Sequence, residues 1–556
     1  MFVKKSWNTK EKKPYVQHHI VESYRDRDTK ESKHRYLLNI SDLPEHVINA
    51  IDQSFKQGKS IIESKVSIKT GDCSKGAGLL AIHRMWKQEK MDRLLVGLTP
   101  EKKKSVELMV CQRILQPGSK LSLKETLRCT LFREAWSKNR FDEEVFYTVM
   151  DVLNENFYSI QEALREKSGA IPVMLFYDIS STYFEGTQAE EGEYGYSRDK
   201  RWDKYQVVIG LVCTGEGLPL AIEVWPANTA DKTTVTGRIR VFQERFGIKK
   251  AVFVGDAGMY TQANVEEIFK AGFDYILKPE WHTQKQQLER QLPMQQELFD
   301  EGHVEWVENG VRYVGYFSEP CKERAAKQRE EGILEAEAEL NQLSRIAAKG
   351  NYYSWTRLRE KVNDLLESCV VKGLYTITID PLDENKDPEQ KTRLALSYTL
   401  NPEELTLKVA TDGMYILQTS LDDTVYSAAE IDESYKKLQL IERAFRNIKS
   451  FLKIRPIFHY KNRRVRAHVL ICFLAYYLVK KMELECRSCG ITEEVVPLLR
   501  SWNDLQLVSL TVTAGEHSRS EWQWSLGPIG EAIQGQIETL GWWRSIDKLR
   551  HSLFKS

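Results

Sequence analysis

The stretch IPVMLFYDISSTYFEG, residues 171–186, decides the fold assignment, because an uninterrupted apolar run meets a carboxylate within it. The run 171–177 is typical of a buried strand, and we expect that strand to end on Asp178. The same pattern recurs in KKAVFVGDAGM (249–259), where a strand at 251–255 is expected to end on Asp256. An aspartate after one strand is a common turn residue. Two of them at one edge of an α/β sheet predict a site, since ligands gather at strand ends.

Length and composition indicate a folded protein of several domains. The chain has 556 residues, of which 42% are hydrophobic and 29% charged, and this length predicts two to four domains. The longest apolar run, 468–479, is too short to cross a bilayer and predicts a buried helix. The first residues contain no apolar signal segment, and nine irregularly spaced cysteines indicate reduced thiols. These features predict a cytoplasmic protein without a membrane segment.

Positive charge is concentrated in one segment, although the net charge of the chain is small. The net charge is +1, but residues 443–482 contain eleven Lys or Arg residues and no Asp or Glu. A basic run is often only a solvated helix face. Forty residues without one acid favour an anionic partner instead.

The chain before the first aspartate reads as strands followed by helices. The first forty residues suggest one or two strands, and 41–168 is expected to be helical. Within it, Pro117-Gly118-Ser119 should separate two helices, with Ser119 as the cap of the second. Basic residues around this break leave a DNA-binding module and an ordinary helical domain equally open.

The middle of the chain predicts an α/β domain that is interrupted by an insertion. We expect strands at 172–177, 206–213, 218–225 and 251–255, helices at 232–246 and 261–271, and a hairpin turn at 216–219. Residues 280–425 read as a β-rich insertion with charged helices at 319–348 and 353–368. Further helices are expected at 424–452, 461–482 and 527–540, and a strand at 507–514.

The helix expected at 424–452 supplies a third acidic residue. Tyr435, Glu442 and Lys449 are spaced by seven, which is about two helical turns, so they should share a face. The packing face would consist of Ile441, Phe445, Ile448 and Leu452. On spacing alone, an ion pair between Glu442 and Arg446 on a solvated face is the simpler interpretation.

Metal chemistry offers a different role for Glu442. Three carboxylates can hold two divalent ions about 3.5–4 Å apart, an arrangement that activates a nucleophile and stabilises the leaving oxygen of a phosphodiester. Mg²⁺ suits such a site because it prefers a few carboxylates, waters and phosphate oxygens. The acid-free run begins directly after Glu442, where basic side chains would hold a nucleic-acid backbone.

The sequence resembles the bacterial insertion-sequence transposases of the DDE class, in the group with a β-rich insertion before the catalytic Glu. That group has the signature Y-x2-R-x3-E-x6-K, which Tyr435, Glu442 and Lys449 match, while Leu438 stands at the Arg position. Similar stretches include FYDISSTYFEG (176–186), VFVGDAGM (252–259) and IERAFRNIKSFLKIRPIFHYKNRRVRAHV (441–469). The resemblance covers about 100–480.

The resemblance implies an RNase H-like core in which Asp178, Asp256 and Glu442 are the catalytic, metal-binding triad for two Mg²⁺ ions, with Mn²⁺ able to substitute. Tyr435 and Lys449 would contact DNA phosphates, and the charge pattern adds Arg446 and Lys453. The DNA partners would be the inverted-repeat ends of the element and the target DNA. Cleavage and strand transfer, with cut-and-paste excision, would take place in a homodimer in the bacterial cytoplasm, bound to the nucleoid.

The resulting domain scheme is α/β, with an RNase H-like catalytic core interrupted by the β-rich insertion and preceded by a helical N-terminal DNA-binding region. Its five segments are 1–168 (DNA-end binding), 169–280 (first part of the core), 281–425 (insertion), 426–485 (second part of the core) and 486–556 (C-terminal region, with a dimerisation role suggested).

Two other functions remain open at this point. A non-catalytic DNA-binding relative of a transposase would keep the fold without the reaction, although all three acidic residues are present. A metal-dependent phosphate-ester hydrolase would use Asp178 as a nucleophile and would not need Glu442. The acid-free basic run argues against the hydrolase.

Overall fold

The structure is a computed structural model, in which the chain forms two compact units. Unit 1 comprises 1–171, 179–229 and 440–556, and unit 2 comprises 172–178 and 230–439. The residues described are 1–8, 15–25, 31–57, 66–123, 143–168, 174–186, 188–190, 192–194, 201, 203–226, 251–255, 260–280, 282–288, 290, 302–350, 353–382, 389–514, 517–524 and 528–554.

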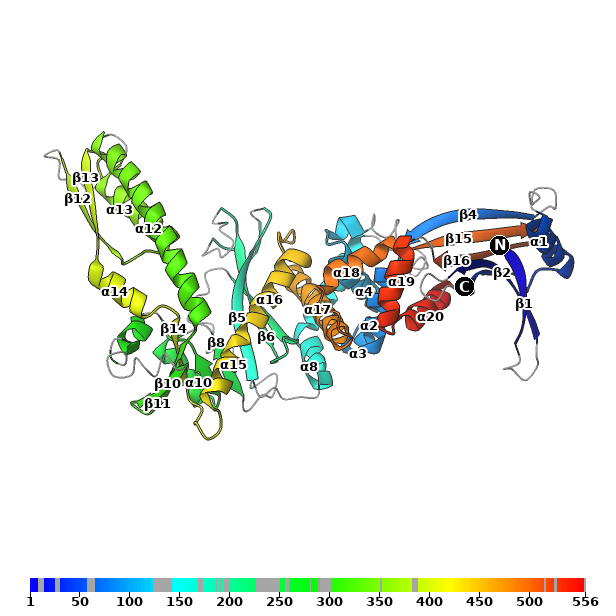
Figure 1. Ribbon diagram of the computed structural model, residues 1–556, viewed down its shortest axis with the longest axis horizontal. Coiled ribbons are helices and arrows are strands. Elements are labelled where there is room, and N and C mark those ends of the chain that lie inside the picture. Colours follow the sequence, from blue (N-terminus) through cyan, green and yellow to red (C-terminus); the bar gives the residue numbers. More distant parts are fainter. Residues whose placement is uncertain are drawn as a thin grey trace. The chain divides into compact units, whose positions relative to one another are not determined.

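Unit 2 contains most of a large mixed sheet (Figure 1). Its strands, in spatial order, are β10 (His303–Glu308), β11 (Val311–Phe317), β14 (Met414–Thr419), β9 (Asp274–Leu277), β8 (Val252–Gly255) and β5 (Met174–Tyr183). Strands β5, β8 and β9 run parallel, and the other neighbouring pairs are antiparallel. Helix α10 (Gln262–Lys270) connects β8 to β9, as a parallel pair requires. The central strands are buried on both faces, which explains their continuous apolar runs.

The insertion in unit 2 has a core of its own. Helices α12 (Glu319–Ala348) and α13 (Trp355–Ser368) pack on the hairpin of β12 (Tyr375–Pro381) and β13 (Leu394–Leu400) (Figure 1). Leu340, Leu358 and Leu394 are fully buried in this core. Helix α14 (Pro402–Ala410) then leads into β14. The predicted helix at 319–348 is confirmed, and the one predicted from 353 begins at Trp355.

Strand β5 also enters unit 1, because residues 179–229 belong there. Its continuation is followed in the sheet by β6 (Gln206–Cys213) and β7 (Pro219–Pro226), which form the predicted hairpin. Gly217 takes a φ of 78° in the turn, a conformation that glycine adopts without strain. After the chain leaves unit 2, Ile457 donates its N–H to Tyr183 and accepts from Glu185, so this later segment lies against the end of β5.

The helical part of unit 1 is organised around α17 (Asn462–Ser488), which packs against α4 (Pro100–Leu115) and α7 (Glu143–Glu155). Residues 468–479 of α17 are all buried, so the prediction of a buried helix is confirmed. The preceding helices of this unit are α1 (Glu45–Gln57), α2 (Ala77–Gln88), α3 (Met91–Leu94), α4 (Pro100–Leu115), α7 (Glu143–Glu155) and α8 (Phe157–Ser168). No helix in the described ranges is both long and apolar enough to cross a membrane.

The two ends of the chain meet within unit 1. Strands β1 (Phe2–Asn8), β2 (Tyr15–Arg25) and β3 (Ser32–Asn39) form one sheet, and β4 (Val66–Lys75), β15 (Gln506–Ala514) and β16 (His517–Trp524) form another. The remaining C-terminal elements are α18 (Val495–Ser501), η4 (Trp502–Asp504), α19 (Pro528–Thr539) and α20 (Trp543–Phe554). Helix α20 packs against α2.

Several predictions about elements are wrong. The first forty residues contain three strands rather than one or two, and the helical interpretation of 41–168 missed β4. In the sequence, β4 has a short strand signal, because only VSIKT alternates apolar and polar residues and the remaining GDCSK does not. It is a strand because β15, more than four hundred residues later, supplies its hydrogen-bonding partner. The expected helix at 232–246 lies outside the described residues.

The break at Pro117-Gly118-Ser119 is confirmed. Helix α4 ends at Leu115, and a new helical segment starts at Lys120. The Ser119 hydroxyl accepts a hydrogen bond from the Ser122 N–H at 3.1 Å, as a helix cap does.

Candidate active site

Asp178 lies within β5 rather than at its end. The apolar run stops at this residue, but the strand continues to Tyr183, so the prediction that the strand ends on Asp178 is wrong. Because strand side chains alternate between faces, Asp178 shares a face with Phe176, Ser180 and Thr182. Those three are buried, whereas Asp178 is partly exposed. A carboxylate in a buried row of a strand is therefore accessible to a ligand.

The register of the parallel strands relates the two aspartates. β5 and β8 pair Met174 with Val252 and Phe176 with Val254. In the sequence, Asp178 and Asp256 each follow the last of these pairs by two residues. Strand β8 is described from Val252 to Gly255, and Asp256, on which the strand is expected to end, lies outside the described residues. The pairing thus gives the two aspartates equivalent sequence positions relative to adjacent strands of unit 2.

Glu442 projects from α16 (Leu438–Arg446), whose opposite side is firmly packed. The predicted packing residues Ile441, Phe445 and Ile448 are all buried, as is Leu452 after the helix. Glu442 is exposed, and among the described residues it has no hydrogen bond and no ion pair, not even with Arg446. The alternative of a local Glu442–Arg446 pair is therefore not observed. This carboxylate is held outward with its oxygens available.

The predicted single helix at 424–452 is wrong. It consists of α15 (Ala428–Lys436), α16 and a π-helical segment, η3 (Asn447–Phe451). The Leu452 N–H donates to the Asn447 carbonyl, one residue further back than in an α-helix. Seven residues therefore no longer equal two turns across this junction. The spacing of Tyr435, Glu442 and Lys449 does not by itself place them on one face.

The predicted phosphate contacts are accessible in different degrees. Arg446 and Lys453 are exposed, and Lys449 in η3 is partly exposed. Tyr435 is partly buried, with its ring centroid 6.3 Å from that of Tyr415. Leu438, which stands at the signature Arg position, is buried. It therefore supplies packing rather than a phosphate contact.

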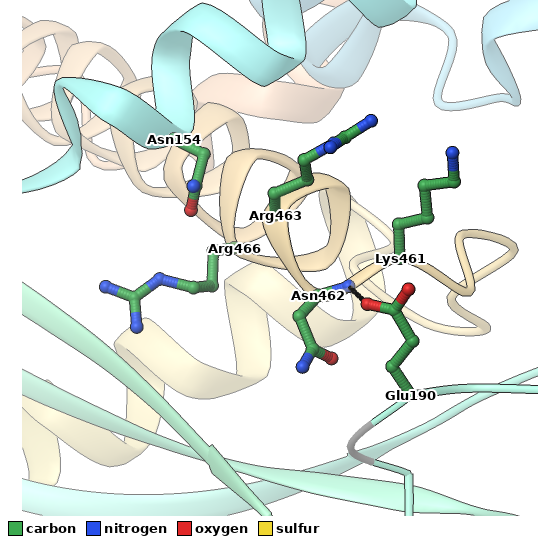
Figure 2. A pocket seen from close by; sticks show the side chains of 6 residues that line it. All are labelled: Asn154, Glu190, Lys461, Asn462, Arg463 and Arg466. Atoms are coloured by element: carbon green, nitrogen blue, oxygen red, sulfur yellow. Dashed lines mark hydrogen bonds between the residues drawn. The ribbon is translucent and has the colours of Figure 1, made fainter.

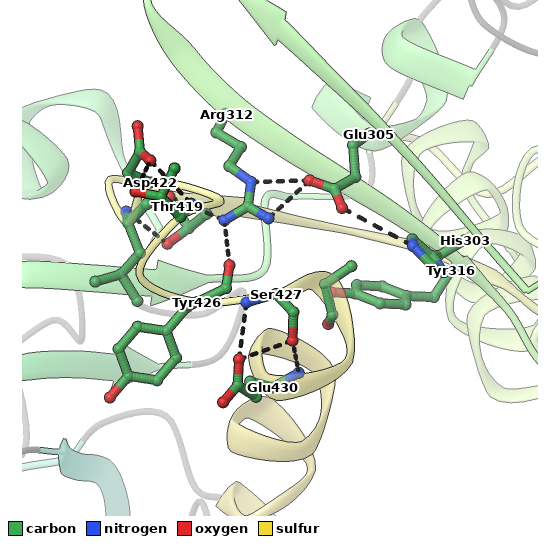
Figure 3. Close-up of polar contacts among 12 residues, drawn as sticks. His303, Glu305, Arg312, Tyr316, Thr419, Asp422, Tyr426, Ser427 and Glu430 are labelled. Carbon is green, nitrogen blue, oxygen red and sulfur yellow. Dashed lines mark hydrogen bonds and ion pairs between the residues drawn. The ribbon is translucent and has the colours of Figure 1, made fainter.

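The start of α15 is fixed by a buried arginine and a helix cap (Figure 3). Arg312 of β11 donates to the carbonyls of Leu421 and Tyr426, at 3.0 and 2.8 Å, and to Glu305 Oε2. Ser427 caps the helix by accepting from the Glu430 N–H, and Glu430 accepts from the Ser427 N–H in return. These bonds hold the chain that leaves β14 for α15 in one conformation.

Sequence reasoning identified the acid-free basic run but not the pocket that it forms. Lys461, Arg463 and Arg466 at the start of α17 line a pocket of about 450 Å³ together with Asn154 and Glu190 (Figure 2). We call it the α17 basic pocket. The Asn462 N–H donates to Glu190 Oε2 at 2.9 Å. Its cations come from consecutive turns of one helix, which suits an extended anion such as a nucleic-acid backbone.

Part of the basic run is neutralised by ion pairs with other residues of the protein. Arg463 and Arg464 both contact Asp151 of α7, with Nε to Oδ1 distances of 3.0 and 3.1 Å. Lys480 is buried and pairs with Glu483 at 3.2 Å. Fewer positive charges are therefore available to a partner than the sequence count suggests.

The described geometry leaves the triad incomplete as a single site. Asp178 belongs to unit 2 and Glu442 to unit 1, and Asp256 is not described. Among the described residues, a set that excludes Asp256, no cluster of three or more potential metal-binding side chains occurs. The triad of Asp178, Asp256 and Glu442 therefore stays a prediction.

Comparison with known proteins identifies the class of this chain. Residues 172–478, more than half of the sequence, match the transposase DDE domain family, and the protein belongs to that family. It is accordingly a transposase, a class of DNA-acting enzymes with nuclease-type activity that generally uses divalent metal ions.

Two further comparisons complete these findings. A similar solved structure, a piggyBac transposase synaptic complex with hairpin DNA, has a TM-score of 0.36 and 8% sequence identity, covering 78% of this chain and 82% of that one. A comparison with curated proteins found no match.

Proposed function

We propose that this transposase binds the terminal inverted repeats of its own insertion sequence, cleaves them and transfers the ends to target DNA by a cut-and-paste route. The observation that carries the proposal is the register of β5 and β8, because Asp178 and Asp256 each follow the last paired residues of these strands by two positions in the sequence. Membership of the DDE family supplies the reaction class. The exposed basic residues after Glu442 support a DNA substrate.

Asp178, Asp256 and Glu442 would hold two Mg²⁺ ions, with Mn²⁺ able to substitute. The donor set fits, because it offers only carboxylate oxygens, which Mg²⁺ prefers. Asp178 is partly exposed, and Glu442 has no partner among the described residues. When bound, the ions would activate the attacking hydroxyl and stabilise the leaving oxygen of the phosphodiester.

The remaining predicted residues would position the DNA. Arg446, Lys449 and Lys453 would contact backbone phosphates, and Tyr435 would contribute its hydroxyl. The α17 basic pocket would extend this contact, since Lys461 and Arg466 line it beside Glu190. Such contacts fix the orientation of the duplex without reading its sequence.

The wider assignments stay proposals as well. Segment 1–168 would bind the transposon ends, 169–280 and 426–485 would form the RNase H-like core around the insertion 281–425, and 486–556 would contribute to a homodimeric synaptic complex. The setting would be the bacterial cytoplasm, with the protein bound to the nucleoid.

The test is cleavage of duplex DNA that carries the inverted repeats flanking the reading frame. The full-length protein is incubated with Mg²⁺, with Mn²⁺ or with EDTA. Asp178→Asn, Asp256→Asn and Glu442→Gln are compared with the control Glu433→Gln, which changes an exposed glutamate of α15 that pairs with Lys437 at 3.0 Å. We expect metal-dependent nicking at the ends, lost in the three variants and kept in the control, while DNA binding survives in all.

Other outcomes separate the alternatives. Binding of the ends without cleavage under any metal condition would identify a non-catalytic relative. Cleavage that survives Glu442→Gln would assign the third metal ligand elsewhere. Hydrolysis of a small phosphate ester that is insensitive to Glu442→Gln would favour the phosphate-ester hydrolase.

A further inference from the structure

A second, smaller pocket in unit 1 is lined by several cationic residues, among them Arg113, Lys120 and Lys453. It has a volume of about 150 Å³, several times the space that one water molecule needs. Its walls come from the end of α4, from the break at 117–120, from 453–459 and from α17. We call it the Lys120 pocket.

Lys120 is the residue of this pocket whose burial is not explained by contacts with the described residues. Its side chain is only 2% exposed, and Nζ has no hydrogen-bond partner among the described residues. Burial of an ammonium group is costly unless it is paired. Burial, with a further contribution from the nearby Arg113, lowers the pKa of Lys120 to about 7. A buried lysine without an anion is thus poorly satisfied in the protein alone.

Arg113 is the second buried cation, and its hydrogen bonds connect two segments of the pocket wall. Its guanidinium donates to the carbonyl of Gly118 at 2.7 Å and to that of Lys453 at 3.1 Å. These bonds join the 117–120 break to the chain that follows η3. Its Nε is buried without a hydrogen-bond partner among the described residues. Of the basic residues around this break, Arg113 and Lys120 are both buried and do not lie on an exposed surface.

The electrostatic surroundings of the pocket are positive. Burial lowers the pKa of His459 to about 3, and the neighbouring Lys120, Arg113 and Arg464 contribute in the same direction. The pKa of the buried His468 is also lowered, first by burial and then by Arg113 and Lys120. Among the described residues, no carboxylate contributes to the pKa shift of Lys120, His459 or His468.

The mouth of the pocket is exposed. Lys453 is exposed, and Phe458 at the rim is 63% exposed. Lys453 has a φ of 47°, a left-handed conformation that is uncommon for a residue with a side chain. The bond from Arg113 to its carbonyl helps to hold this conformation. Such backbone strain persists where the surrounding structure enforces it, and it is concentrated at functional sites.

We propose that the Lys120 pocket binds one phosphate group, and that in the working enzyme this group is a DNA backbone phosphate. Phosphate oxygens accept strong hydrogen bonds from lysine and arginine and would satisfy the Lys120 Nζ. Inorganic phosphate shares this chemistry. Assigning the phosphate to DNA rests on the proposed function. Because Lys453 follows η3, which continues the chain from the helix that contains Glu442, a phosphate held here would fix DNA beside the end of η3.

The first arm of the test asks whether the pocket binds phosphate at all. Thermal unfolding of the full chain is followed in sodium phosphate and in sodium chloride at matched ionic strength and pH. The variants are Lys120→Met, which keeps the side-chain length, and the control Lys103→Met, which changes a partly exposed lysine of α4 outside the pocket. We expect phosphate to raise the midpoint for the wild type and the control, and not for Lys120→Met.

A second variant guards against a folding defect. Lys453→Gly removes the cation at the rim and also suits the positive φ, so its fold should be kept. We expect a reduced response to phosphate with an unchanged or higher midpoint in chloride. Equal midpoints of the wild type in phosphate and chloride, together with unchanged DNA affinity of Lys120→Met, would overturn the proposal.

The second arm distinguishes the source of the phosphate. DNA affinity is measured over a range of salt concentrations. If a backbone phosphate occupies the pocket, Lys120→Met should weaken binding about tenfold and lower the slope of log affinity against log salt by about 1. Phosphate stabilisation with unchanged DNA binding would identify a site for the free ion. Cleavage does not enter either readout, so failure of the proposed function leaves the phosphate test intact.

Discussion

Glu442 and Glu433 differ in whether their carboxylates form an ion pair. Glu433 in α15 pairs with Lys437, whereas Glu442 in α16 has no partner among the described residues. An exposed carboxylate without a partner contributes little to stability. Its position directly before an acid-free basic run therefore favours a ligand-binding role over a structural one.

Glu442→Gln should therefore separate activity from stability. We expect the free energy of unfolding to change by less than about 0.5 kcal/mol, as for other exposed substitutions. DNA cleavage should fall on the order of 100-fold or more, the range for loss of one electrostatic contact to developing charge. Thermal unfolding and cleavage of end-bearing duplexes measure the two effects. A large loss of stability would instead give Glu442 a structural role.

Lys120, unlike Glu442, should affect the stability of the protein. Its pKa is lowered from the ordinary 10.5 to about 7. Below pH 7 it is charged in both states, and the folded state bears the full cost of the buried charge. Between pH 7 and 10.5 only the unfolded state holds the proton, so this cost shrinks as pH rises and disappears above pH 10.5.

Lys120→Met should accordingly stabilise the protein in chloride at low pH. With about 1.4 kcal/mol for each pH unit between the two pKa values, the gain is on the order of 5 kcal/mol below pH 7 and vanishes near pH 10.5. Burial lowers the pKa of His459 to about 3 and also lowers that of His468, so neither ring takes up a proton between pH 7 and 10.5. Burial also lowers the pKa of Arg113, raises the pKa of Cys472 and raises that of Tyr147 to about 12. Denaturant unfolding at about pH 6 and pH 10 measures the gain. An equal gain at both would show that it does not come from the charge.

At the scale of elements, apolar runs predicted strands β5, β6, β7 and β8 of the large sheet but not all their limits. The hairpin of β6 and β7 was predicted because both strands are buried and a turn with Gly217 separates them. β5 was cut short at Asp178 because the apolar run ends there. The strand continues since its hydrogen bonds come from neighbouring strands, which local sequence does not reveal.

The helix predicted at 424–452 shows the same limit of local sequence patterns. The packing face of α16 was predicted correctly from its 3.6-residue periodicity. The interruption at Lys437 and the π-helical turn at 447–451 were not. No proline or glycine marks either place, so the local sequence carries no breaker signal.

Ser427→Ala tests the start of α15. The Ser427 side chain and Glu430 form a capping box, so its loss should lower the free energy of unfolding by about 1 kcal/mol. The matched control is Glu430→Gln, which keeps an acceptor for the Ser427 N–H and should have a smaller effect. Denaturant unfolding compares the two. An unchanged free energy of unfolding in Ser427→Ala would mean that the hydroxyl of Ser427 adds nothing.

At the scale of the molecule, the chain order and the spatial order differ. Unit 1 is assembled from the beginning, the middle and the end of the sequence. Its C-terminal residues complete the N-terminal part, since β15 pairs with β4 and α20 packs on α2. Segment 486–556 is thus part of this unit's own core, whatever it contributes to an assembly.

Trp542→Ala tests this closure of unit 1. Trp542 is 2% exposed, and its ring centroid lies 5.9 Å from that of Trp502 and 4.5 Å from the Arg84 guanidinium carbon. Truncation should lower the free energy of unfolding by about 3–5 kcal/mol. The control Trp7→Ala removes a 68% exposed indole and should change it by less than about 0.5 kcal/mol. Unfolding followed by circular dichroism measures both, and equal effects would contradict the role of Trp542.

The sequence by itself determined the class of this protein, the α/β alternation, the insertion with its long helix and the packed face of α16. These follow from local periodicity and from motifs whose spacing is written in the chain. Only the tertiary structure decided that β5 passes through Asp178, that Glu442 lacks the Arg446 partner, and that Arg113 and Lys120 turn inward. The reason is physical: strand length, side-chain pairing and burial depend on neighbours that are distant in sequence, and such contacts leave no local periodicity.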